Sequence, residues 1–137
     1  MTFRKSVIAA TILTLILAGG LYANHHLYVG AMKGVAKVMK PTGAALGSGD
    51  MDTVKKNANA MARNFAIMAA WWEGRGTAAA SKLADQAMKD AVALRKAANG
   101  GDAAGAKAAM GRIQGSCKAC HSAHRVKNDD GSWGFKD

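Results

Sequence analysis

The chain has 137 residues and a formal net charge of +10, with 50% hydrophobic and only 6% aromatic residues. This length suits one domain rather than two, and the hydrophobic fraction excludes wholesale disorder. A single proline argues against a β-sandwich or barrel, and two cysteines are too few for a disulfide-rich scaffold. The sequence therefore predicts a small, basic, mainly helical domain with an acidic or anionic partner.

The N-terminal segment, residues 1–23, has the layout of a targeting or anchoring sequence. Arg4 and Lys5 precede an uncharged apolar run at residues 7–23, which is the order of a secretory signal and is close to the shortest helix that spans a bilayer. Two interpretations stay open, a cleaved signal peptide and a retained membrane anchor formed by residues 4–23. Both place the following domain in the periplasm, because the basic residues keep their end on the cytoplasmic side.

Turn-like sequences divide residues 24–127 into four helical stretches. The three glycine-containing segments that separate them lie at residues 47–50, 73–76 and 99–102. Asp50 and Asp102 stand immediately before apolar-periodic runs, where helix N-caps are expected.

Apolar periodicity indicates how these stretches pack. The second stretch carries an apolar residue at every third or fourth position over residues 51–72, which is typical of an amphipathic helix. In the first stretch, Pro41 can kink or interrupt the helix. Short connections predict an all-α, antiparallel up-down-up-down four-helix bundle. Residues 128–137 lack periodicity and are predicted to form a C-terminal tail, pinned by Trp133 and Phe135.

The chemistry of the chain is concentrated in the sequence Cys117-Lys118-Ala119-Cys120-His121. C-x-x-C-H is the attachment sequence of a covalent c-type haem. On a helix the two cysteines are one turn apart, so each thiol can add to one haem vinyl group. His121 then offers an imidazole nitrogen to the iron as the proximal axial ligand.

Three other interpretations of the two cysteines are weaker. A thioredoxin-like C-x-x-C requires a βαβ context that the sequence lacks. A zinc site needs a fourth ligand, for which His124 is the nearby candidate. A disulfide within one helical turn has poor geometry.

The segment GSCKACHSAHR resembles the haem-binding fourth helix of class II c-type cytochromes, that is, the cytochromes c′ and low-spin relatives such as cytochrome c-556. The resemblance extends over roughly residues 28–127 and implies one covalently attached haem c. In this family an arginine usually follows the motif near the haem propionates, and Arg125 stands at that place. His124 occupies a position where the family commonly has tyrosine. Tyr28 is expected to pack at the haem edge.

The sixth ligand of the iron is expected to be Met32. The segment AMKGVAKVMKPTGAAL resembles the first helix of the same family. Aligning the two on the Lys-Pro pair places Met32 at the position whose residue decides, in that family, whether the iron has a sixth ligand. Helix geometry favours the same residue, because the last turns of the fourth helix face the early turns of the first. Met39 lies roughly 10 Å farther along the same stripe. The alternative is that Met32 is core packing.

These observations predict a single-haem cytochrome that transfers electrons and is not an enzyme. Two alternatives remain: a five-coordinate cytochrome c′ that binds nitric oxide or carbon monoxide, and a haem subunit of a larger membrane oxidoreductase. The basic surface, including Lys118 and Lys127, favours acidic or membrane-bound redox partners over nucleic acid. Relatives in the family often dimerise through their first two helices, so a homodimer is a further alternative.

Overall fold

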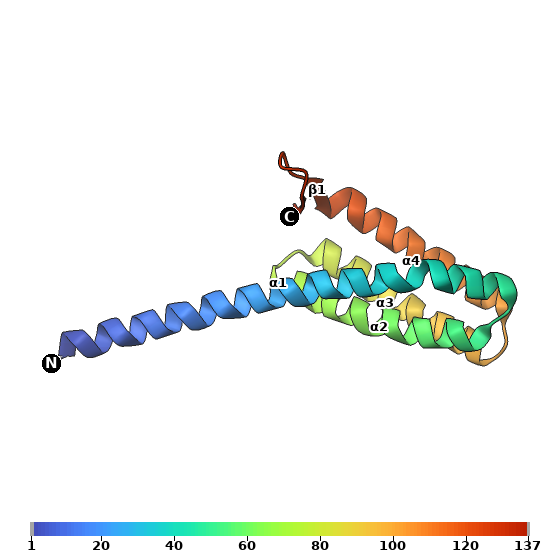
Figure 1. Ribbon diagram of the computed structural model, residues 1–137, viewed down its shortest axis with the longest axis horizontal. Helices are drawn as coiled ribbons and strands as arrows, with labels where there is room; N and C mark the ends of the chain where they lie inside the picture. Colours follow the sequence, from blue (N-terminus) through green and yellow to red (C-terminus); the bar gives the residue numbers. More distant parts are fainter. Residues whose placement is uncertain (1, 137) are drawn as a thin grey trace.

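Four helices and a two-stranded sheet make up the computed structural model (Figure 1). The elements are α1 (Thr2–Ser48), α2 (Met51–Gly74), α3 (Ala78–Asn99), α4 (Ala103–His124), β1 (Arg125–Lys127) and β2 (Trp133–Phe135). The structure describes residues 25–136 together with the bounds of α1, so the predicted signal peptide or anchor at residues 1–23 lies outside the described part. Within that part, none of the helices combines the length and the apolar character that a membrane crossing requires.

The helices pack in chain order, as the short connections predict. Extensive contacts join α1 to α2, α2 to α3 and α3 to α4, which confirms the four-helix bundle. By contrast, α1 and α4 barely touch, and Figure 1 shows α4 diverging from the other helices toward its C-terminal end. The bundle is therefore closed on three sides and open between its first and last helices.

The three turns between helices are short because each contains a glycine in the left-handed region. The φ angles are +78° at Gly49, +75° at Gly76 and +69° at Gly101, a conformation that other residues adopt only with strain.

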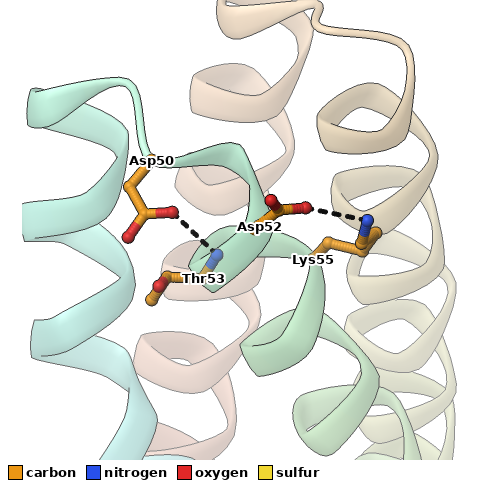
Figure 2. Close-up of polar contacts among 4 residues, drawn as sticks. All are labelled: Asp50, Asp52, Thr53 and Lys55. Carbon is orange, nitrogen blue, oxygen red and sulfur yellow. Dashed lines mark hydrogen bonds and ion pairs between the residues drawn. The ribbon is translucent and has the colours of Figure 1, made fainter.

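The predicted N-caps of α2 and α4 are confirmed. The Asp50 carboxylate accepts a hydrogen bond from the backbone N–H of Thr53 at 3.0 Å, beside an exposed ion pair between Asp52 and Lys55 (Figure 2). The Asp102 carboxylate accepts a hydrogen bond from the backbone N–H of Gly105 at 2.8 Å. Each bond satisfies one amide that a helix start leaves without an intrahelical partner.

The apolar stripe predicted for the second helix forms the centre of the core. The buried residues of α2 are Val54, Ala58, Met61, Phe65, Met68 and Trp72. Of the two effects considered for Pro41, interruption of the helix does not occur, since α1 continues through it to Ser48. The buried Thr42 hydroxyl donates to the Val38 carbonyl at 2.6 Å, which supplies one side-chain hydrogen bond in the turn that contains the proline.

The C-terminal segment is a β-hairpin rather than a tail without structure. Strands β1 and β2 pair antiparallel, with Arg125 opposite Phe135 and Lys127 opposite Trp133. A turn through Gly131, at φ +81°, joins the strands. Of the two aromatic residues expected to pin this segment, Phe135 packs against the core, whereas Trp133 is 58% exposed. The Asp130-Gly131 pair was the sequence signal for this hairpin.

Candidate functional site

A single apolar cavity of about 230 Å³ gathers most of the predicted site residues. It lies where α1 and α4 diverge, with α2 and α3 behind it. Met32 and Tyr28 line it from α1, and Cys117, Cys120 and His121 line it from α4. The remaining lining residues are nearly all apolar: Val35, Ala36, Met39, Phe65, Met68, Trp72, Leu83, Ala84, Ala87 and Ser116. The cavity therefore offers thiols, thioethers and an imidazole in a largely apolar wall.

The attachment motif lies in the last two turns of α4, as the sequence predicts. Cys117 and Cys120 are unpaired, half-buried thiols on the same side of the helix, one turn apart. Burial raises the pKa of both thiols, and the charge of Cys120 raises that of Cys117 further. The thiols are therefore protonated at neutral pH.

His121 is held in the form that binds a metal. Burial lowers the pKa of its imidazole, and the Arg125 guanidinium lowers it further because two positive charges repel. At neutral pH the ring is uncharged, so one nitrogen keeps a lone pair for coordination.

Tyr28 lies deep at one end of the cavity, next to the motif. The residue is 4% exposed. Burial raises the pKa of its phenol to about 12, the neighbouring Cys120 adds to the rise, and a hydrogen bond from Trp72 opposes it. Tyr28 and Cys120 line the same cavity.

Three methionines line the cavity, namely Met32, Met39 and Met68. Met32 lies one turn after Tyr28 on α1, and Met39 lies roughly 10 Å farther along the same helix. Met39 and Met68 thus contribute to the wall of the cavity as well as to the core of the bundle.

Arg125 does not line the cavity. Its guanidinium lies over the Trp133 ring, 4.0 Å from the ring centroid, in a cation–π contact. Arg125 and Trp133 border a shallow hollow on the outer side of α4, together with Lys118, His121 and Ser122. The predicted role of Arg125 near haem propionates therefore stays a prediction.

The other interpretations of the cysteines find no matching arrangement. Among residues 25–136, no three His, Cys, Asp or Glu side chains come together in a way that could hold a metal ion. His124, the candidate fourth zinc ligand, is buried against Trp72, with ring centroids 5.4 Å apart. The cysteines lie on a helix in a helical bundle, so the βαβ context of a thioredoxin-like site is missing.

Comparison with protein families gives a match to the part of the chain that carries the motif. The family model described as Cytochrome C′ matches residues 76–125, which contain α3, α4 and all three residues of the C-x-x-C-H motif. The match supports assignment to the class II cytochrome c′ family. Neither a curated protein nor a solved structure matches the chain. The matched range ends at Arg125, the first residue of the hairpin, and does not include α1, which carries Met32.

The cytochrome c′ family binds a covalently attached haem c, and the site fits this cofactor. The two thiols stand one turn apart at the cavity wall, where thioether attachment requires them. Apolar side chains suit the faces of a porphyrin, and the neutral imidazole of His121 is a suitable axial ligand. The open side of the bundle between α1 and α4 provides the place for a flat cofactor, because little protein-to-protein packing would be lost there.

An aromatic cluster beside the cavity was not anticipated as a unit. It consists of Tyr28, Trp71, Trp72, His124 and Phe135, and we call it the end cluster. Tyr28 and Trp71 have ring centroids 4.2 Å apart, and Phe135 lies 5.0 Å from Trp71. These residues come from α1, α2, the end of α4 and β2, and no local periodicity links them.

Proposed function

We propose that the protein is a single-haem electron carrier whose iron is held by His121 and Met32. One observation carries this proposal: Met32 lines the same cavity as Cys117, Cys120 and His121, from the facing helix. Two ligands on opposite sides give a closed, six-coordinate iron suited to electron transfer.

Haem c, when bound, supplies a reversible one-electron couple between iron(II) and iron(III). The cysteines of α4 would hold the group covalently, and His121 would offer an uncharged imidazole. The apolar wall of the cavity excludes water and disfavours the extra charge of the ferric state, which raises the reduction potential. A thioether ligand from Met32 acts in the same direction.

The decisive experiment compares the optical and EPR spectra of the ferric protein with those of two variants. Met32→Ala should convert a low-spin spectrum into a high-spin one. Met39→Ala is the matched control, because it removes the same chemistry from the same helix and the same cavity, and it should leave the spectrum unchanged. A low-spin signal that survives in Met32→Ala and disappears in Met39→Ala would transfer the ligand role to Met39.

The rival function is gas binding by a five-coordinate iron. It is favoured by the family match, since cytochromes c′ include such proteins. It is also favoured by the apolar lining of the cavity, in which Met32 would then pack beside the iron without binding it. Carbon monoxide added to the reduced protein separates the two proposals. A closed site should resist binding until Met32 is removed. Fast binding to the wild-type protein, together with a high-spin spectrum that Met32→Ala does not alter, would establish the gas-binding function.

We further propose that the carrier works in the periplasm with acidic redox partners. The proposal is supported by the exposed cationic side chains around the motif, Lys118, Arg125 and Lys127, and by the apolar N-terminal run. Because salt screens the attraction between opposite charges, the rate of electron transfer to an acidic partner should fall as the ionic strength rises. Cell fractionation and N-terminal sequencing of the mature protein would show whether residues 1–23 are removed or act as an anchor.

A further inference from the structure

We propose that the C-terminal hairpin is a clasp that sets the spacing between α1 and α4, and that Phe135 is its positioning residue. The proposal extends the proposed function, because it explains how Met32 and His121 are held on opposite sides of one cavity. Apart from Arg125, the hairpin lies beyond the range that matches the cytochrome c′ family model, residues 76–125.

The hairpin is attached firmly to the end of α4. The backbone N–H of Lys136 donates to the carbonyl of His124 at 3.0 Å, and the His124 ring Nδ1 lies 3.4 Å from the Lys136 carbonyl oxygen. The pairing of Arg125 with Phe135 completes this attachment. Any movement of the hairpin therefore moves the last turn of α4, where His121 lies.

At its other side the hairpin is attached to α1 and α2 through one side chain. The Phe135 ring lies 5.1 Å from the Tyr28 ring and 5.0 Å from the Trp71 ring, centroid to centroid. It also meets Trp72 edge-on at 5.7 Å. Tyr28 precedes Met32 by one turn of α1, so this contact fixes the part of α1 that faces the motif.

The contact with Phe135 supplements a weak direct interface between α1 and α4. Direct packing between α1 and α4 is sparse among the described residues, because the cavity separates them. Trp72 on α2 bridges the two sides indirectly, because it contacts both His124 and Tyr28. Phe135 adds a direct contact from the segment attached to the end of α4 to the ring of Tyr28, so its loss should loosen the spacing of the two predicted ligands.

The test measures ligation in the haem-loaded protein. Phe135→Ala should raise the fraction of high-spin ferric haem and speed carbon monoxide association to the reduced protein by about ten-fold, which corresponds to about 1.4 kcal/mol. Phe135→Trp should restore both readouts, because it supplies another large ring. Val126→Ala is the matched control, since it truncates a side chain that is 39% exposed on the same hairpin, and it should behave as wild type.

The outcomes distinguish the clasp from the proposed function. Wild-type ligation and association rate in Phe135→Ala, in a protein where Met32→Ala loses the low-spin signal, would overturn the clasp and leave the function standing. A high-spin wild-type protein would overturn ligation by Met32. The clasp would then be decided by the carbon monoxide rate alone: an increase in Phe135→Ala over Val126→Ala supports it, and equal rates refute it.

Discussion

The ion pair between Asp90 and Arg112 gives an asymmetric prediction about stability. Asp90 on α3 has a side chain only 7% exposed, and it accepts a hydrogen bond from Arg112 Nε on α4 at 2.6 Å. Gln86 donates to its second oxygen at 3.1 Å. The Arg112 side chain is 52% exposed, so water can replace the carboxylate around the guanidinium but no cation can replace Arg112 beside the carboxylate.

Arg112→Met keeps the aliphatic stem and removes the charge, which leaves a buried carboxylate with Gln86 alone. We expect a loss of about 2–3 kcal/mol in the free energy of unfolding, the range for a buried charged group that loses a charge-assisted hydrogen bond. Asp90→Ala removes the buried charge itself and leaves Arg112 to the solvent, so it should cost about 1 kcal/mol. The double variant should be more stable than Arg112→Met alone.

Urea unfolding of the haem-loaded protein, followed by far-UV circular dichroism, measures all three values by linear extrapolation. The reasoning fails if Asp90→Ala costs as much as Arg112→Met, because the cost would then come from the lost contact between the helices. It also fails if the double variant is the least stable of the three. Unchanged spectra of the haem would show that the losses concern the α3–α4 interface and leave the cavity intact.

Three further predictions concern helix contacts and caps. Gly34→Ala would place a Cβ 2.6 Å from Asn64 Nδ2. The gain in stability of about 1 kcal/mol that alanine gives over glycine in a helix should therefore appear only when Asn64 is also changed to Ala. Thermal unfolding of the single and double variants measures this difference. Asp102→Ala should destabilise the fold by about 1 kcal/mol through loss of the α4 cap, measured by urea unfolding. The hydrogen bond from Thr53 lowers the pKa of Asp50 below 3.8. The Asp50 carboxylate therefore stabilises the folded state above that pH, and this stabilisation is lost as the pH falls through the lowered pKa. In urea titrations at several pH values, Asp50→Asn should make the free energy of unfolding depend less on pH in the acid range.

The sequence predicted the four helices and the attachment motif because both are local signals. The apolar stripe from Val54 to Trp72 repeats at the helical period, and the turns carry glycines where positive φ angles are required. The motif at Cys117, Cys120 and His121 needs only its spacing. The choice of Met32 over Met39 remains a prediction, since both methionines line the cavity.

Features that depend on distant parts of the chain could not be predicted. The end cluster joins Tyr28, Trp71 and Phe135, whose sequence neighbours show no shared pattern. The hairpin has two three-residue strands, too short for an alternating pattern to stand out. Whether Pro41 interrupts the first helix could not be decided locally, because tertiary packing of α1 against α2 maintains the helix through it.

The sequential order of helix contacts also determines how the chain folds. Nearly all packing joins helices that follow one another, so folding requires little closure of long loops and should be fast. The contact between Phe135 and Tyr28 is different, since it joins opposite ends of the described chain. Together with the neighbouring contact between Phe135 and His25, it closes the longest loop made by the ring contacts of the described residues. The contact should therefore form last, after the helices that flank the cavity have assembled. Phe135→Ala should then unfold faster than the wild type while its folding rate stays unchanged, as folding and unfolding kinetics would show.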